Sequence, residues 1–189
     1  MNKIINLIIV ILSITMAMAY EKYKEPQFTL IEKKDNIEIR QYSEYVIAKT
    51  SISLDNSEED NNMFMVLASY IFGKNEENKN IPMTAPVTTF ENNESYDMLF
   101  YMLDVKNIEE LPKPSGQDIV FEKINLGKCA VVGFSWFTNE SKIKKYKTIL
   151  EKFIEENKYK KISPFMINRY DPPWKLPFLR RNEILVQIK

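Results

Sequence analysis

The side chains best suited to chemistry gather near the end of the chain. Two carboxylates, Asp171 and Glu183, could act as general acids or bases, and the guanidinium group of Arg180 could pair with an anionic ligand. Trp174 follows two consecutive prolines, which fix the backbone and remove two hydrogen-bond donors. The segment Tyr170–Glu183 is therefore predicted to be a rigid loop that carries a large aromatic side chain to a pocket mouth or to a barrel end.

Several familiar kinds of site are excluded by the composition. The chain contains no histidine, which rules out Ser-His-Asp and Cys-His catalysis, histidine-based zinc sites, a histidine haem ligand and the attachment motif of c-type haem. The four glycines form neither a phosphate-binding loop nor a dinucleotide-binding fingerprint. The single cysteine, Cys129, cannot form an intramolecular disulfide, and its apolar neighbours predict a small core residue rather than a nucleophile.

The charge balance and the N-terminal segment bear on partners and location. With 26 basic and 26 acidic residues, nothing steers the chain to nucleic acid. Residues 1–19 are typical of a secretory signal, with Lys3, an apolar run from Ile4 to Ile14, and the small-residue cleavage site Ala17-Met18-Ala19. Cleavage there would leave 170 residues (189 − 19), which suits one domain without a stable membrane span. We therefore expect a secreted or periplasmic protein; an uncleaved anchor is the alternative.

Hydrophobic periodicity predicts an α+β fold with two similar halves. The first half shows strands at Phe28–Ile31, Ile37–Gln41 and Tyr45–Ser53, an acidic loop at Asp55–Asp60, a helix of about fourteen residues ending near Gly73, and strands at Met83–Phe90 and Tyr96–Leu103. After a charged linker, the second half shows strands at Ile119–Ile124 and Lys128–Trp136, a helix from about Ser141 to Lys158, and strands at Pro164–Tyr170 and Glu183–Ile188.

Both halves thus run strand, strand, helix, strand, strand, over about residues 25–105 and 118–189. This shared order indicates an internal duplication. Two such halves would supply about eight antiparallel strands and two helices. We expect a distorted antiparallel β-barrel in which residues 20–189 form a single domain with one helix packed on each half.

Two proline-rich segments make the chain similar to a known family. The first is Asn80-Ile81-Pro82-Met83-Thr84-Ala85-Pro86-Val87, and the second is the Tyr170–Glu183 segment with its Tyr-Asp-Pro-Pro-Trp and Arg-Arg-Asn-Glu motifs. With Tyr45 to Thr50, Tyr70-Ile71-x-Gly73-x-Asn75 and Pro112-x-Pro114, these motifs resemble the SOUL haem-binding protein family from about Glu25 to Lys189. The resemblance implies a distorted β-barrel of two pseudo-repeats and the binding of haem or another porphyrin in an apolar surface pocket.

We expect the ligand to lie beside the first helix and the two proline-rich segments. The candidate lining residues are Phe64, Leu67, Ala68, Ile71, Met83 and Trp174, and Lys175 and Arg180 are the candidates for pairing with propionate groups. Each has a structural interpretation as well. The helix residues could be ordinary core packing, Met83 could fill a gap, and Arg180, Arg181 and Glu183 could form an ion pair at a barrel end.

Haem binding without histidine would be non-covalent and would depend on packing. A flat porphyrin that buries roughly 300 Å² of apolar protein surface gains roughly 7 kcal/mol, which leaves micromolar affinity after the costs of association. If iron is ligated, tyrosinate, methionine, lysine or Cys129 must do it, and we favour a tyrosine. The metal ligand is therefore left unassigned.

Three functions are compatible with this sequence. The first is non-enzymatic binding of haem or a related tetrapyrrole, as a carrier, buffer or scavenger. The second, suggested by the similarity of the fold to bacterial multidrug-sensing effector domains, is binding of other flat apolar molecules or of a protein partner. The third is an enzyme of tetrapyrrole modification that uses Glu183 or Asp171 in acid–base work, although no paired carboxylates mark such a site.

Overall fold

The structure, a computed structural model, describes residues 23–54 and 62–189. The predicted signal segment 1–19 and the acidic loop Asp55–Asp60 lie outside the described residues, so both stay predictions. Among the described residues, no helix combines the length and the apolar composition that a membrane crossing requires.

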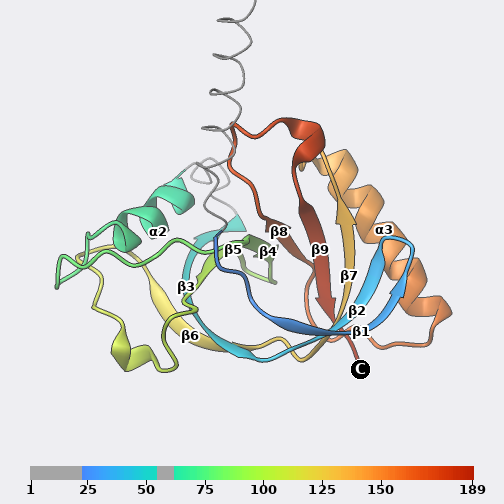
Figure 1. The fold of residues 1–189 in the computed structure, drawn as a ribbon, viewed down its shortest axis with the longest axis horizontal. Helices are drawn as coiled ribbons and strands as arrows, with labels where there is room; N and C mark the ends of the chain where they lie inside the picture. Colours follow the sequence, from blue (N-terminus) through green and yellow to red (C-terminus); the bar gives the residue numbers. More distant parts are fainter. Residues whose placement is uncertain (1–22, 55–61) are drawn as a thin grey trace, which may run out of the picture.

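Nine antiparallel strands form one curled sheet with the shape of a half-barrel (Figure 1). They are β1 (Phe28–Lys34), β2 (Ile37–Tyr42), β3 (Glu44–Ser53), β4 (Val87–Glu91), β5 (Ser95–Tyr101), β6 (Val120–Asn125), β7 (Lys128–Phe134), β8 (Met166–Arg169) and β9 (Asn182–Gln187). Their order is β1-β2-β7-β9-β8-β4-β5-β3-β6, so β1 and β6 are the edges of the sheet within the described residues. The α+β class and the curled antiparallel sheet are confirmed, with nine strands in place of about eight.

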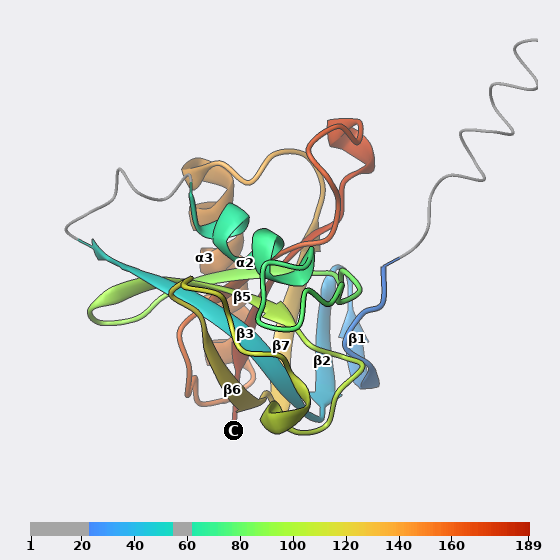
Figure 2. The same cartoon turned by 90° about the vertical axis from the view of Figure 1, so that its left-hand side faces the viewer.

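Each helix packs on the outer part of one half of the sheet. Helix α2 (Met63–Ile71) lies on β3 and β5, and α3 (Glu140–Glu156) lies on β7 and β9 (Figures 1 and 2). Apart from β1, the sheet consists of two sets of four strands that meet where β8 pairs with β4. Read from the outside inward, one set has the order β2-β7-β9-β8 and the other β6-β3-β5-β4. The internal duplication stays a prediction, because strand order alone does not establish a common origin.

The two helices differ in sequence and therefore in surface. Helix α3 begins at an N-cap, where the Asn139 side chain accepts a hydrogen bond of 3.0 Å from the backbone N–H of Lys142. It buries one apolar stripe and exposes lysines and glutamates. Helix α2 carries no charged residue, so its exposed side is apolar as well as its buried side. It ends before Gly73, whose φ of 102° suits glycine in a helix C-terminal turn.

The core occupies both faces of the sheet, because side chains alternate along each strand. On β7, Ala130 and Val132 pack with the α3 core, whereas Cys129 and Val131 pack in a cluster on the opposite face. Cys129 is fully buried, as predicted, and burial raises the pKa of its thiol to about 12. A thiol in this environment stays protonated and is a poor nucleophile.

Candidate functional site

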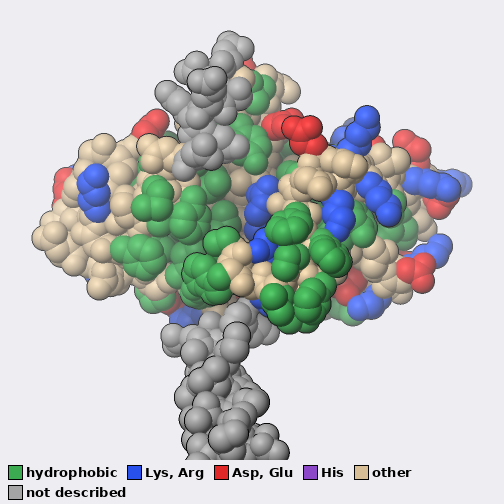
Figure 3. Space-filling model, turned by 90° about the horizontal axis from the view of Figure 1, so that it is seen from above, with side chains coloured by type: hydrophobic (Ala, Val, Ile, Leu, Met, Phe, Trp, Pro, Cys, Tyr) green, Lys and Arg blue, Asp and Glu red, His purple; other side chains and the backbone are tan. Residues whose placement is uncertain are grey.

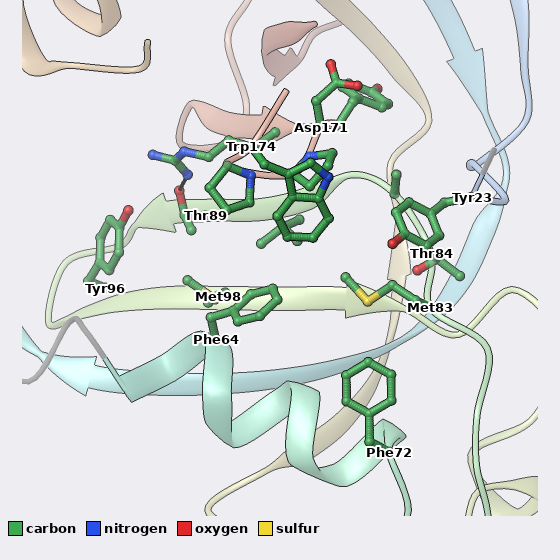
Figure 4. A pocket seen from close by; sticks show the side chains of 16 residues that line it. Tyr23, Phe64, Phe72, Met83, Thr84, Thr89, Tyr96, Met98, Asp171 and Trp174 are labelled. Atoms are coloured by element: carbon green, nitrogen blue, oxygen red, sulfur yellow. Dashed lines mark hydrogen bonds between the residues drawn. The ribbon is translucent and has the colours of Figure 1, made fainter. Parts of the chain in front are cut away.

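A mainly apolar cavity of about 540 Å³ lies between α2 and the connection from β8 to β9 (Figure 4). We call it the α2 cavity. Phe64 and Phe72 border it on the helix side, and Trp174 covers it from the opposite side. The lining comprises Tyr23, Phe64, Phe72, Met83, Thr84, Ala85, Val87, Thr89, Tyr96, Met98, Arg169, Tyr170, Asp171, Pro172, Pro173 and Trp174.

The first proline-rich segment forms one wall of the α2 cavity. Its backbone is held at two points: the Thr84 hydroxyl donates a 2.7 Å hydrogen bond to the Tyr101 carbonyl, and the Ala85 N–H donates one of 2.9 Å to the Lys24 carbonyl. The Ala85-Pro86 peptide bond is cis. These contacts place Met83 in the cavity wall (Figure 4).

The second proline-rich segment is braced by its own polar groups. The Asp171 carboxylate accepts a 2.6 Å bond from Lys175 Nζ and a 2.5 Å bond from the Arg181 backbone N–H. Arg180 donates to the backbone carbonyls of Lys175 and Pro173. The charged groups of the motif therefore close the loop on itself, and this closure places Trp174 at the cavity mouth.

The predicted site residues divide into three groups. Phe64, Met83 and Trp174 line the α2 cavity. The other three helix residues lie beneath α2 in the core and are at most 3 % exposed: Leu67, Ala68 and Ile71. They are buried and do not line the cavity, which is the position expected for ordinary core packing, and a role for them in ligand binding stays a prediction.

The two basic candidates do not line the α2 cavity either. Lys175 borders a smaller neighbouring cavity of about 180 Å³, where its ammonium group is paired with Asp171. Arg180 is engaged with the loop backbone and lies over the Phe137 ring at 5.1 Å. Both therefore stabilise the loop in this structure, and a role in propionate binding stays a prediction.

Glu183 belongs to a buried ion pair that links distant strands. Its carboxylate accepts two hydrogen bonds from Arg40, of 2.9 and 3.0 Å, and one of 2.7 Å from the Tyr170 hydroxyl. The prediction that Glu183 forms an ion pair with Arg180 or Arg181 is therefore wrong. Glu183 pairs with Arg40, and Arg181 pairs with Glu25. Sequence could not identify Arg40 as the partner, because the two residues are 143 positions apart.

Arg169 is a cavity residue that the sequence analysis missed. It ends β8, and its guanidinium donates to two hydroxyl groups, of Thr138 at 2.9 Å and of Thr89 at 2.8 Å. Within the described part of the chain it has no carboxylate within 4.0 Å. With only hydroxyl partners among residues 23–54 and 62–189, this half-buried guanidinium places a positive charge at the edge of an apolar cavity, which favours an anionic group there. Its position directly before the Tyr-Asp-Pro-Pro motif was the only sequence signal.

Four side chains that line the cavity carry an atom of a type that can ligate iron: Tyr23, Tyr96, Met83 and Met98. A third lining tyrosine, Tyr170, is less suited to ligation, because burial and the neighbouring Glu183 carboxylate raise the pKa of its hydroxyl well above the usual range. Cys129 lies in the core, away from the cavity lining, and its Sγ is 3.2 Å from the Leu126 carbonyl oxygen. The donor set that the cavity offers is thus phenol and thioether.

A second groove, of about 710 Å³, lies beside α3 and differs in chemistry. We call it the α3 groove. Its lining includes two lysines and three glutamates, Lys144, Lys147, Glu91, Glu140 and Glu151, together with Ile143 and Ile167. Tyr96 borders both spaces.

Comparison with known proteins agrees with these features. A family model described as SOUL heme-binding protein matches residues 23–187, which is nearly all of the described chain. The chain belongs to the SOUL haem-binding family. The family resemblance inferred from the proline-rich motifs is therefore confirmed, although no curated protein matches the SOUL chain closely enough to add a function.

Solved structures share the fold of this SOUL protein at low sequence identity. The EcmrR C-terminal domain has a TM-score of 0.62 and 13 % identity, covering 81 % of this chain and 96 % of that one. A hydrolase from Listeria innocua has a TM-score of 0.53 and 9 % identity, covering 93 % of this chain and 97 % of that one. An uncharacterised conserved protein from the same organism has a TM-score of 0.55 and 8 % identity, covering 92 % and 96 %. At these identities the similarity shows the fold alone.

Proposed function

We propose that this SOUL protein binds haem or a related tetrapyrrole non-covalently in the α2 cavity and acts as a carrier, buffer or scavenger. Location outside the cytoplasm, through the N-terminal segment, is part of the proposal. The observation that carries it is the α2 cavity itself, an apolar space between Phe64 and Trp174 (Figure 4). The guanidinium of Arg169 lines this cavity and, among the described residues, is hydrogen-bonded to threonine hydroxyls and to no carboxylate.

The size and the lining of the α2 cavity suit a flat apolar ligand. Its volume of about 540 Å³ lies within the range of roughly 300 to 1,000 Å³ that is usual for small-molecule sites. Aromatic rings on two sides favour stacking on a planar macrocycle, and Met83 and Met98 supply adaptable apolar surface. These contacts support binding without a strong axial ligand.

Arg169 supplies the polar end of the proposed site. Its two threonine partners hold the guanidinium in place without neutralising its charge. A carboxylate on the rim of a porphyrin could pair with this group and so fix the orientation of the macrocycle. When bound, haem would supply an iron centre, and Tyr23, Tyr96, Met83 or Met98 would be the candidates to ligate it.

The carboxylates of the family motif support a structural role over catalysis. Glu183 is taken up by Arg40 and Tyr170, and Asp171 by Lys175 and the Arg181 backbone. A carboxylate held in such contacts has its lone pairs occupied and is a weak general base. We therefore propose a binding protein and not an enzyme of tetrapyrrole modification.

Parallel titrations with hemin and with metal-free protoporphyrin IX test this proposal. If packing is the main source of affinity, both compounds should bind saturably at 1:1, with micromolar dissociation constants that agree within about threefold. Much tighter binding of hemin alone would show that an iron ligand dominates. Absence of any Soret change with either compound would overturn the proposed function.

A further inference from the structure

Six large apolar side chains project from two neighbouring connections of the chain. They lie on the β7–α3 and β8–β9 connections, are between 51 % and 80 % exposed, and comprise Trp136, Phe137, Trp174, Leu176, Phe178 and Leu179. We call them the aromatic tip. The face of the molecule seen in Figure 3 shows apolar side chains gathered with Lys and Arg side chains beside them. A soluble surface rarely exposes so many large apolar groups together unless they contact something.

The aromatic tip is a rigid structure. The Trp136 N–H donates a 2.8 Å hydrogen bond to the Pro177 carbonyl, and the Asn182 side chain donates one of 2.9 Å to the Trp136 carbonyl. The Trp136 and Phe178 rings lie 6.5 Å apart. Trp136 has a φ of 79°, a left-handed conformation that is unfavourable for a bulky residue. The fold thus holds a large aromatic ring outward in a strained conformation, with half of its surface in solvent.

The charged groups around the aromatic tip have a small positive excess. The segments 135–139 and 171–181 contain Lys175, Arg180 and Arg181 against a single acid, Asp171, so their net charge is +2 (3 − 1). The Asp171 side chain is only 5 % exposed and pairs with Lys175. Lys142, on the first turn of α3, adds a cation 5.6 Å from the Trp136 ring, and Glu140 on the same turn adds an acid. Because Arg181 is also paired with Glu25, the local excess is one positive charge (4 − 3). This local excess contrasts with the zero net charge of the whole chain.

We infer that the aromatic tip docks on an anionic lipid membrane. Tryptophan, phenylalanine and leucine side chains with adjacent Lys and Arg are the combination that enters the interfacial region of a bilayer, where the rings reach the acyl boundary and the cations meet phosphate groups. The Lys and Arg side chains around the aromatic tip are complementary in charge to such a surface. The apolar side chains project from two exposed loops, a shape that can enter a bilayer more readily than it can fill a groove on another protein. Docking would involve no membrane-spanning segment.

Trp174 belongs to both the aromatic tip and the α2 cavity. Docking would therefore bring the cavity mouth to the bilayer, where apolar macrocycles partition. This consequence rests on the proposed function, whereas docking itself does not. The vesicle experiment is for that reason done with ligand-free protein, so that its outcome is independent of the hemin titrations.

Tryptophan emission reports on the aromatic tip directly, because the chain has only two tryptophans and both lie there. The purified protein is titrated with vesicles of phosphatidylcholine containing about one-third phosphatidylglycerol, and with phosphatidylcholine alone. Docking predicts a blue shift and binding at least about tenfold tighter to the anionic vesicles, weakened severalfold by high salt. No shift and no co-sedimentation with anionic vesicles would overturn the inference and leave the tip to a protein partner.

A pair of matched variants locates the binding surface. Phe178→Ser with Leu179→Ser is expected to weaken vesicle binding at least about tenfold, whereas Leu30→Ser with Ile31→Ser, on exposed strand β1, leaves it unchanged. Lys142→Glu keeps the apolar groups and is expected to weaken binding to anionic vesicles alone. Equal losses in the tip and β1 variants would contradict the inference. So would a dimer in sedimentation that the tip variant dissociates, because the tip would then be an interface between copies.

Discussion

The two helix-bearing halves of this SOUL protein differ in the number of charged side chains beside their helices. Each helix covers two strands of its half, and a groove lies beside each helix. Half of the residues that line the α2 cavity are aromatic or methionine, and only Arg169 and Asp171 are charged. The α3 groove also contains apolar residues, but five of its twelve lining residues are lysines and glutamates. The fold therefore determines where a groove lies, and the residues on the exposed side of the helix determine what the groove can bind.

The composition of each helix explains the contrast. The outer side of α3 carries Lys–Glu pairs such as Lys152 with Glu156, which are well solvated and need no cover. The outer side of α2 exposes Phe64 at 42 % and Met65 at 59 %, and Phe72 follows it at 68 %. Covering apolar surface of this extent with a ligand or another surface removes it from water and lowers the free energy.

Leu150→Ala is expected to have the largest effect on stability and none on binding. Leu150 is fully buried between α3 and the sheet, so its truncation leaves a cavity and lowers the free energy of unfolding by about 3 kcal/mol. Urea denaturation measures this loss. Hemin affinity, measured at a temperature where the variant is folded, should stay within about twofold of wild type. A parallel loss of affinity would show that the α3 half contributes to the site.

Arg169→Met is expected to have the largest effect on binding. Loss of a charge-assisted hydrogen bond to a propionate group costs about 1.5 kcal/mol, or roughly tenfold in affinity for hemin. The measurement is repeated with the dimethyl ester of protoporphyrin, which lacks the carboxylates. The wild type and the variant should bind the ester equally well. A tenfold loss that persists with the ester would contradict the proposed ion pair.

Phe64→Ala and Ile143→Ala compare the two helices directly. Phe64 is 42 % exposed in the α2 cavity, so its truncation should weaken hemin binding about fivefold, or about 1 kcal/mol, with little loss of stability. Ile143 lines the α3 groove, and its truncation should leave hemin affinity unchanged. Isothermal titration calorimetry of both variants tests the assignment. Equal effects at the two positions would argue that neither groove is the specific site.

Tyr70→Phe reports on the anchoring of α2 through the pH dependence of stability. The Tyr70 hydroxyl donates to the Pro112 carbonyl at 2.9 Å, and burial raises its pKa to about 12. Above about pH 10 the Tyr70 hydroxyl ionises in the unfolded chain, whereas in the folded protein it keeps its proton. Tyr70 therefore lowers the free energy of unfolding as the pH rises. Between pH 9 and 11 the wild type should lose about 1 kcal/mol more than Tyr70→Phe, in urea denaturation at each pH. Equal slopes would contradict the buried hydroxyl.

Sequence patterns predicted what depends on neighbouring residues. The helix predicted from about Ser141 to Lys158 corresponds to α3, because its buried apolar stripe follows from local periodicity. The proline-rich motifs indicated the loops that carry Met83 and Trp174, because prolines restrict the backbone locally.

What the sequence could not provide depends on contacts between distant strands. Arg169 became a cavity residue only when β8 paired with β4 and brought it to Thr89. The partner of Glu183 is set by the pairing of β2, β7 and β9 across the sheet. Local patterns also could not decide which apolar residues of α2 face the cavity, since both sides of that helix are apolar.

The most direct test of the α2 cavity uses Trp174 as a reporter at its mouth. In the Trp136→Phe variant, Trp174 is the only tryptophan, and a porphyrin in the cavity would lie against its ring. Titration with hemin should quench its emission in a saturable way that ends at one equivalent and coincides with the Soret change. A Soret change at one equivalent without quenching of Trp174 would place the ligand elsewhere and contradict the account.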